Sequence, residues 1–353
     1  MNVRTVPTNA SAQSSSTAIS ELLGNSFGGL SIAVIIPCYN EAIAIGKVVQ
    51  DFKEALPSAD IYVYDNNSSD DTRAVAETAG AIVRSETRQG KGFVVRRMFA
   101  DIEADIFVMV DGDDTYDASA APMLVEKLVL EGLDMVNGAR KPDSNEAYRP
   151  GHAMGNKGLS GIVRFMFGDE FKDMLSGYRV FSRRYVKSFP AMSTGFETET
   201  ELTIHALELE MPIAEVETDF KDRAEGSESK LRTFSDGFRI LWTIASLLKQ
   251  EKPVYVFGLA SALMALTSVG LAYPIIAEFI ETGLVPRFPT AILSTGLMIL
   301  SFLSLTCGII LDAVTRSRAE SKRSRYLMIP SVHHRLSEVQ YALQRVVSFA
   351  ERG

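Results

Sequence analysis

The sequence predicts an α/β domain with a mostly parallel sheet, covered by helices on both faces and followed by two membrane-spanning helices. Short apolar runs alternate with helical patterns across the first half of the 353-residue chain, as in parallel sheets whose strands are joined by crossover helices. Each of these apolar runs leads into polar residues. Two stretches of 24 and 21 uncharged residues, 254–277 and 291–311, follow near the C-terminus.

The first half of the chain supplies most of the predicted sheet. Residues 1–30 are rich in Ser, Thr, Ala and Asn and lack the features of a signal peptide, so we expect a disordered cytoplasmic leader. Apolar runs predict strands at Ile32–Pro37, Ile61–Asp65, Ala81–Arg84, Ile106–Val110 and Met135–Ala139. Helical periods between them predict helices at Glu41–Leu56, Asp70–Ala79, Gly90–Glu103 and Ala118–Leu130.

Later elements complete a domain predicted to span residues 31–232. The patterns predict a helix at His152–Gly168, strands at Tyr178–Ser182 and Ile213–Phe220, and a helix at Thr198–Glu210. Six apolar side chains then recur at helical spacing within residues 233–253: Phe234, Phe238, Leu241, Trp242, Ala245 and Leu248. Basic residues flank this stripe. It is predicted either to lie in a membrane interface, which we favour, or to pack on the domain.

Residues 254–315 are predicted to form a two-helix membrane hairpin rather than two core helices of a soluble domain. Each uncharged stretch exceeds the roughly 20 residues that cross about 30 Å of hydrocarbon, where a helix satisfies its own backbone. Basic residues flank the hairpin, whereas the link contains one, Arg287, so both termini are predicted to be cytoplasmic. The cytoplasmic tail, residues 316–353, has an apolar helical face for the domain or for a sister subunit, which leaves a homo-tetramer open.

Composition excludes some classes of function. The net charge of −8 and the pI of about 5.2 argue against general attraction to nucleic acid. No Cys or His cluster has the spacing of a zinc site. The two cysteines, Cys38 and Cys307, are predicted to be small core residues in a reducing compartment, because nothing in their spacing indicates a disulfide framework.

The most informative motif is Val110-Asp111-Gly112-Asp113-Asp114, at the end of a predicted buried strand. Open α/β sheets bind ligands at the carboxyl ends of their strands. Two carboxylates separated by one glycine can reach the same hard cation, and Mg²⁺ or Mn²⁺ often takes its other ligands from substrate phosphates. An isolated Asp-x-Asp is more often an acidic loop that caps a helix. Here the neighbouring loops favour the metal.

Those neighbouring loops are also polar. They are Pro37-Cys38-Tyr39-Asn40-Glu41 after the first strand, Asp65-Asn66-Asn67-Ser68-Ser69-Asp70-Asp71-Thr72 after the second, and Arg88-Gln89-Gly90-Lys91-Gly92 after the third. In a parallel sheet these loops converge on one edge. The set resembles the family 2 glycosyltransferases, which have a Rossmann-like, nucleotide-sugar-binding GT-A fold. The resemblance implies that these loops bind the nucleotide, through Pro37, Tyr39, Asn40, Glu41, Asp65, Asn67, Asp70, Lys91, Gly92, Asp111 and Gly112.

Two further segments resemble polyprenyl-phosphate glycosyltransferases, which include dolichol-phosphate mannose synthases and bacterial relatives with a C-terminal membrane hairpin. The first is the acceptor-side segment, residues 173–181, and the second is the Arg/Gly/Ser-Lys-Leu element, residues 223–231. By this likeness Arg223, Ser229 and Lys230 bind the acceptor phosphate. One inserted residue leaves the register of Ser227 against Ser229 open. Outside this context, charges such as Arg223 and Lys230 would indicate a solvated face.

The resemblance implies an inverting transfer of a sugar from a nucleotide donor to a polyprenyl phosphate at a bacterial inner membrane. Asp111 and Asp113 would hold Mg²⁺ or Mn²⁺ and serve the leaving diphosphate. Asp173 matches a position suggested for a base, and orienting the acceptor is an equal alternative. The donor is expected to be a UDP-sugar such as UDP-glucose, UDP-N-acetylglucosamine or UDP-galacturonate, with GDP-mannose also open, and the product would serve envelope or lipopolysaccharide glycosylation.

Two other functions fit parts of the sequence. A processive polysaccharide synthase resembles the first half, but that class carries a Gln-x-x-Arg-Trp element, and the context of the single tryptophan, Trp242, does not match it. A non-catalytic membrane scaffold would not need the Asp111 and Asp113 pair or the basic residues Arg223 and Lys230. The sequence therefore favours the transferase.

Overall fold

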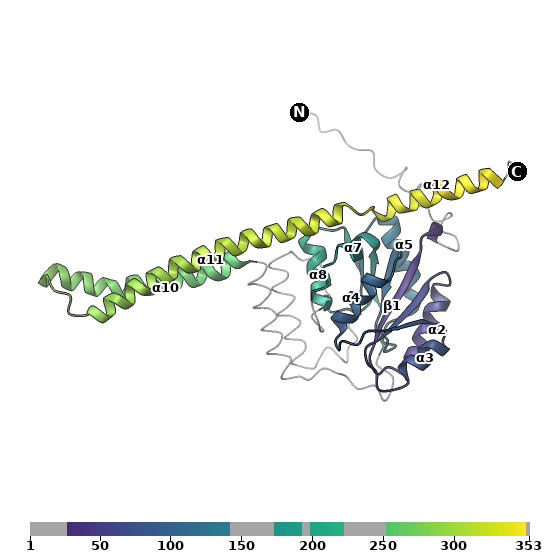
Figure 1. The fold of residues 1–353 in the computed structure, drawn as a ribbon, viewed down its shortest axis with the longest axis horizontal. Helices are drawn as coiled ribbons and strands as arrows, with labels where there is room; N and C mark the ends of the chain where they lie inside the picture. Colours follow the sequence, from purple (N-terminus) through teal and green to yellow (C-terminus); the bar gives the residue numbers. More distant parts are fainter. Residues whose placement is uncertain (1–26, 142–172, 193–197, 222–251, 351–353) are drawn as a thin grey trace, which may run out of the picture. The chain divides into compact units, whose positions relative to one another are not determined.

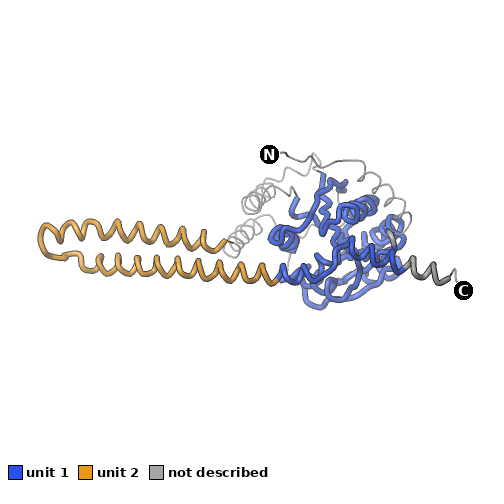
Figure 2. Tube along the Cα trace, turned by 90° about the horizontal axis from the view of Figure 1, so that it is seen from above, with its two compact units in different colours: residues 1–231, 322–353 blue, residues 232–321 orange. Residues whose placement is uncertain are grey.

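The computed structural model describes residues 27–141, 173–192, 198–221 and 252–350. The elements predicted at 152–168 and 233–253 lie outside these ranges, apart from the last two residues of the second. The chain divides into two compact units, residues 1–231 with 322–353 (unit 1) and residues 232–321 (unit 2), and each is described by itself (Figure 2).

Unit 1 is built on a seven-stranded sheet with the strand order β3-β2-β1-β4-β6-β5-β7 (Figure 1). The strands are β1 (Ile32–Cys38), β2 (Asp60–Asp65), β3 (Ile82–Ser85), β4 (Ile106–Met109), β5 (Met135–Arg140), β6 (Arg179–Ser182) and β7 (Ile213–Thr218). β6 runs antiparallel to β4 and β5, and the other pairs are parallel. The prediction of a mostly parallel sheet is confirmed. The reversed β6 brings Gly177, just before it, to the carboxyl end of β4.

Helices cover both faces of this sheet, as predicted. They are α2 (Ile45–Ala55), α3 (Thr72–Thr78), α4 (Lys91–Asp101), α5 (Ala121–Glu131), α7 (Arg183–Ser188) and α8 (Thr198–Glu208). Short 3₁₀ helices occur at Phe27–Gly29 and Ala118–Ala120. Val34 and Ile36 of β1 pack with α2, α3 and α5, whereas Ala33 and Ile35 pack with α4, α7 and α8. Alternate residues of one strand thus belong to two separate cores.

The predicted start of the first helix at Glu41 was wrong. α2 begins at Ile45, because the Glu41 carbonyl accepts hydrogen bonds from the backbone N–H groups of Ala44 and Ile45, at 3.0 and 2.9 Å, and closes a turn. Residues 39–44 therefore remain a loop beside the end of β1. A polar loop is the local structure that the predicted nucleotide site requires.

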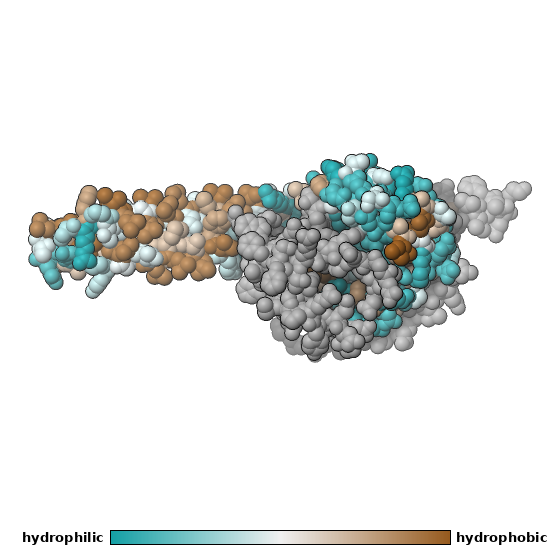
Figure 3. All heavy atoms as spheres, turned by 90° about the horizontal axis from the view of Figure 1, so that it is seen from below, coloured by the Kyte–Doolittle hydropathy of each residue, from teal (hydrophilic) through white to brown (hydrophobic). Residues whose placement is uncertain are grey.

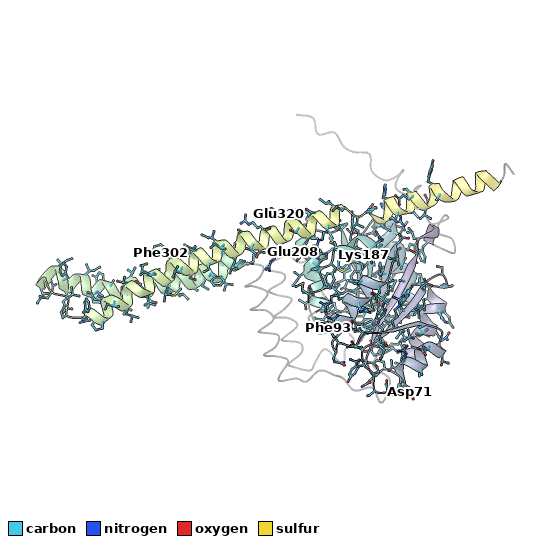
Figure 4. The ribbon with its side chains drawn as sticks, viewed as in Figure 1. Asp71, Phe93, Lys187, Glu208, Phe302 and Glu320 are labelled. Atoms are coloured by element: carbon cyan, nitrogen blue, oxygen red, sulfur yellow. The ribbon has the colours of Figure 1, made fainter. Side chains whose placement is uncertain are left out.

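The end of the chain packs on unit 1 as a C-terminal strap, defined here as residues 322–342, which comprises the end of α11 (Phe288–Leu327) and most of α12 (Val332–Ala350). Val332 and Leu336 are buried in the same core as α5. The Lys322 ammonium lies 2.5 Å from Glu208 of α8 (labelled in Figure 4), and the Tyr326 hydroxyl donates to Asp134 over 2.7 Å. The sequence left two packing partners open for the tail, its own domain or a sister subunit. In the structure the strap packs on its own domain.

The described part of unit 2, residues 252–321, contains two helices that are long and apolar enough to cross a bilayer: α10 (Pro253–Thr282) and α11 as far as residue 321. In each, 11% of the most apolar window is buried, and their surface is hydrophobic (Figure 3). The prediction that Cys307 is a core residue was wrong, because its side chain is exposed on α11, whereas Cys38 is buried as predicted.

A serine seam joins α10 to α11. The Ser261 and Ser301 hydroxyl oxygens lie 2.9 Å apart, and those of Ser268 and Ser294 lie 3.3 Å apart. Hydroxyls of both pairs also donate to the backbone carbonyl across the seam. Gly308 continues the seven-residue spacing of Ser294 and Ser301, and a Cβ there would lie 2.9 Å from Phe257. Small side chains thus allow close approach while their polar atoms stay satisfied.

Candidate active site

The first two polar loops are joined by hydrogen bonds between backbone and side chains. The Asn40 N–H donates to the Ser68 hydroxyl over 2.9 Å, and the Glu41 N–H donates to the Thr72 hydroxyl over 2.8 Å. Asn40 has a positive φ of 54°, a conformation that asparagine tolerates better than most residues. Burial raises the pKa of Asp70, but hydrogen bonds from Thr72 and from the backbone of Ala42 outweigh this effect and lower it.

The third loop is held by an amide from the second. The Asn66 side chain donates to the carbonyls of Glu86 and Arg88, at 2.9 and 2.7 Å, and accepts from the Gly90 N–H over 2.7 Å. Gly90 has a φ of 137°, which favours glycine, and α4 begins immediately after it. These contacts place Lys91 in the first turn of α4, at the carboxyl edge of the sheet.

Asp111 follows β4, and its carboxylate lies against two other segments. Its Oδ1 is 2.6 Å from the Lys91 ammonium. A Cβ built on Gly177 would fall 2.7 Å from Asp111 Cγ, so the carboxylate lies directly against the glycine backbone. Gly112 allows a similar approach, because a Cβ there would lie 2.6 Å from the sulfur of Cys38. Because Gly112 and Gly177 have no side chains, the segments that contain Cys38, Asp111 and Gly177 can lie directly against one another.

Asp113 lies deeper than Asp111, and its loop is connected to the chain that follows β7. The Thr115 hydroxyl donates to Asp113 Oδ1 over 2.6 Å, and the Thr115 carbonyl accepts from the Lys221 N–H over 2.8 Å. Tyr116 forms an isolated antiparallel bridge with Phe220. Phe220 and Lys221 are therefore bound to the Asp113 loop. In the sequence, Arg223 follows Lys221 by two positions.

Tyr116 also connects the Asp113 loop to the acceptor-side segment. Its hydroxyl accepts from the Gly177 N–H over 2.8 Å. Burial and the nearby charge of Asp111 raise the pKa of Tyr116 to about 12, so the phenol stays protonated at neutral pH. It is a neutral anchor for Gly177.

Asp173 forms a close ion pair with Arg140 at the end of β5. Asp173 Oδ2 accepts from Arg140 Nε over 2.8 Å and Oδ1 accepts from Nη2 over 2.9 Å. Backbone N–H groups of Arg140 and Leu175 donate to the same carboxylate. Burial raises the pKa of Asp173, but the guanidinium outweighs it and lowers the pKa overall. A carboxylate with four donors and a lowered pKa is a weak proton acceptor, which favours orientation over general-base catalysis.

Sequence reasoning missed Glu199, near the start of α8. Its Oε1 lies 2.5 Å from the Lys91 ammonium, and its side chain is 8% exposed. Burial would lower the pKa of Lys91, but attraction to Asp111 and Glu199 exceeds that effect and raises it, so the lysine stays charged. The sequence carries no separate signal for Glu199, because the burial of its neighbours Thr198, Thr200 and Leu202 is seen only in the structure.

The other predicted nucleotide residues border the same edge. Pro37 is in β1, opposite Tyr64 of β2, and Tyr39, just beyond β1, is 37% exposed. Asp65 ends β2 and accepts from the Ser68 N–H over 3.2 Å, while Asn67 donates to the Thr87 carbonyl over 2.7 Å. Gly92 is buried in α4. The predicted acceptor-phosphate residues Arg223, Ser229 and Lys230 lie outside the described residues.

The donor set fits a hard cation that shares its ligands with a substrate. Among the described residues, no group of three His, Cys, Asp or Glu side chains could hold a metal ion alone. Asp111 and Asp113 offer carboxylate oxygens from one loop, and Mg²⁺ is typically bound by one or two carboxylates with substrate phosphates. This chemistry suits Mg²⁺ or Mn²⁺ with a diphosphate better than a dedicated protein metal site.

Comparisons with known proteins agree with the fold. The model for glycosyl transferase family 2 matches residues 33–189. Glycosyltransferase AglJ of Haloferax volcanii is 30% identical over 299 residues, covering 83% of this chain and 96% of that protein. The dolichyl-phosphate hexose transferase of the same organism is 28% identical over 222 residues, covering 63% of this chain and 95% of that protein.

A solved structure extends the comparison to three dimensions. Glucosyl-3-phosphoglycerate synthase from Mycobacterium tuberculosis, in complex with Mn²⁺, UDP-glucose and phosphoglyceric acid, superposes with a TM-score of 0.53 and 27% identity. The match covers 65% of this chain and 83% of the synthase. This chain has a mixed sheet and converging polar loops, and it matches AglJ over 96% of that protein's length. It belongs to the family 2 glycosyltransferases.

Proposed function

We propose that the protein transfers a sugar from a nucleotide-sugar donor to a polyprenyl phosphate at the cytoplasmic face of a bacterial inner membrane. The observation that carries the proposal is the contact of Asp111 with both Lys91 and Gly177. It joins the candidate diphosphate site to the acceptor-side segment. Donor and acceptor groups that approach these two segments would meet within one site, as transfer requires.

The donor is proposed to be a UDP-sugar. Support comes from the Mycobacterium tuberculosis synthase, whose structure contains UDP-glucose and Mn²⁺. UDP-glucose, UDP-N-acetylglucosamine and UDP-galacturonate are the sugars to compare first, with GDP-mannose as the alternative base. The polyprenyl acceptor is supported by the likeness to a dolichyl-phosphate hexose transferase.

The charges of the site suit a single displacement with inversion. Asp111 and Asp113 would hold Mg²⁺ or Mn²⁺, which would neutralise charge on the leaving diphosphate when bound. Lys91 adds a protein cation at the same place. The acceptor phosphate is substantially ionised near neutral pH, so Asp173 need not take a proton, and its pairing with Arg140 suits an orienting role. Arg223, Ser229 and Lys230 are proposed to position the phosphate.

The membrane assignment is supported by α10 and α11, which are long, apolar and largely exposed. Basic residues before and after the pair support a cytoplasmic position for both ends and for the catalytic domain, by the positive-inside rule. The protein would thus be a two-span enzyme whose lipid substrate lies in the same bilayer. A homo-tetramer remains part of the proposal, and crosslinking in detergent tests it.

The test is transfer of radiolabel from a panel of nucleotide sugars into organic-extractable undecaprenyl phosphate. Asp111→Ala and Asp113→Ala are expected to abolish transfer while the protein still inserts into membranes. Asp101→Ala is the matched control, because Asp101 pairs on α4 with the exposed Arg97. Label in an insoluble polymer would support the polysaccharide synthase instead, and absence of any product would support a scaffold. Full activity of both site variants under chelation would refute the metal assignment.

The acceptor site has its own test. Arg223→Ala is expected to raise the KM for undecaprenyl phosphate at least about tenfold, with a smaller change for the donor, because charge-assisted hydrogen bonds to phosphate are among the strong ones. Equal losses for both substrates would contradict the role assigned to Arg223.

A further inference from the structure

Glu199 is a buried carboxylate that the proposed transfer chemistry does not use. Its Oε1 lies 2.5 Å from the Lys91 ammonium, whose other carboxylate contact is Asp111 Oδ1 at 2.6 Å. One ammonium thus joins two carboxylates, and only Asp111 belongs to the predicted metal pair. The second oxygen of Glu199, Oε2, has no hydrogen-bond partner in the described part of the chain.

This arrangement creates a conflict when a divalent cation arrives. A cation that binds Asp111 competes with the Lys91 ammonium for the same carboxylate. Lys91 is only 13% exposed, and a buried ammonium without a partner is strongly unfavourable. Displacing Lys91 from Asp111 is therefore acceptable only where another anion holds the lysine. Glu199 already contacts Lys91, and its Oε2 can accept a further hydrogen bond.

We propose that Glu199 is a positioning residue that keeps Lys91 paired when a divalent cation takes Asp111, and that it thereby makes Asp111 available to the cation. The proposal rests on the function proposed above. Lys91 then remains at the start of α4, beside the bound diphosphate. Glu199 touches neither the cation nor the sugar in this role, because it acts through the lysine.

The test is a double-mutant cycle on Mn²⁺ binding by the full-length protein in detergent, read by electron paramagnetic resonance of free Mn²⁺, with and without UDP. Glu199→Gln is expected to weaken binding about tenfold when Lys91 is present, because Lys91, once displaced from Asp111, then loses the other carboxylate that it contacts among the described residues. In a Lys91→Met background the same substitution should weaken binding less than about threefold. General electrostatic attraction between Glu199 and Mn²⁺ would give the same factor in both backgrounds.

The matched control is Glu201→Gln, two residues further along α8. Glu201 accepts from the Met192 N–H over 2.8 Å, so the substitution removes the same charge from the same helix without touching Lys91. Its Mn²⁺ affinity should equal that of the wild type. Thermal unfolding without metal checks the fold of each variant, and the double variant leaves neither partner of the Lys91–Glu199 pair charged.

Two results would overturn the inference at different levels. Equal loss of Mn²⁺ affinity on Glu199→Gln in both backgrounds would remove the positioning role while the proposed function stands. Absence of Mn²⁺ binding to the wild type, or binding that Asp111→Asn leaves intact, would remove the metal assignment itself. A tenfold loss confined to the Lys91 background would support both.

Discussion

Gly177→Ala tests the geometry of the site with a single added methyl group. Gly177 does not have a positive φ, so alanine at this position introduces no backbone strain. Its Cβ would lie 2.7 Å from Asp111 Cγ, whereas carbon atoms prefer separations of about 3.5–4.0 Å. Gly177 is held by its hydrogen bond to Tyr116. The Asp111 carboxylate must therefore retreat by about 1 Å.

A displacement of about 1 Å in a reacting assembly can reduce the rate about 100-fold, which corresponds to about 2.7 kcal/mol in the activation free energy. The expected result is a loss of this size in kcat/KM for lipid-linked sugar formation. Overpacking should lower the free energy of unfolding by about 1–3 kcal/mol, which circular dichroism measures separately. Gly258→Ala is the control, because nothing lies within 4 Å of its added Cβ. Wild-type kcat/KM in Gly177→Ala would refute this reasoning.

Two further predictions concern stability. Asp173→Asn leaves Arg140 without its carboxylate and is expected to cost about 3 kcal/mol at pH 7. Because the folded pKa of Asp173 is lowered, its contribution is present above the unfolded pKa of about 3.9 and is lost as pH falls through the folded pKa. In urea titrations the variant should therefore lose less free energy of unfolding than the wild type as the pH is lowered from about 5 to about 2. An equal loss in the two proteins would contradict the ion pair. Leu336→Ala should cost about 2–3 kcal/mol, whereas Leu327→Ala, at a position 71% exposed, should be within about 0.5 kcal/mol of wild type; equal effects would show that the strap does not stabilise unit 1.

Periodicity predicted most elements of the first half because the strands there are short runs rich in apolar residues. β4 is an example, with all four residues from Ile106 to Met109 buried. The first residue of a helix was harder to predict than the position of a strand, since a polar loop and the first turn of a helix have similar compositions. The loop at 41–44 shows this, because its turn is closed by the Glu41 carbonyl rather than by a distinctive capping side chain.

The site was partly predictable for the same reason. Asp65 ends β2, Lys91 begins α4 and Asp111 follows β4, so the rule for parallel sheets brings these positions to one edge. Glu199 comes from a helix far along the chain and contacts Lys91 across 108 positions of sequence, a pairing that no local pattern encodes. The orientation of β6, which delivers Gly177 to Asp111, depends on long-range strand pairing for the same reason.

The C-terminal strap has a consequence for the order in which the protein matures. Val332 and Leu336 belong to the same core as Leu30 and Val129, and the His333 ring lies 2.6 Å from the Val129 carbonyl. A ribosome makes these residues only after both apolar helices of unit 2. The nascent catalytic domain therefore keeps part of its core open until the membrane anchor has been synthesised, and a chain truncated within the anchor would expose that apolar surface.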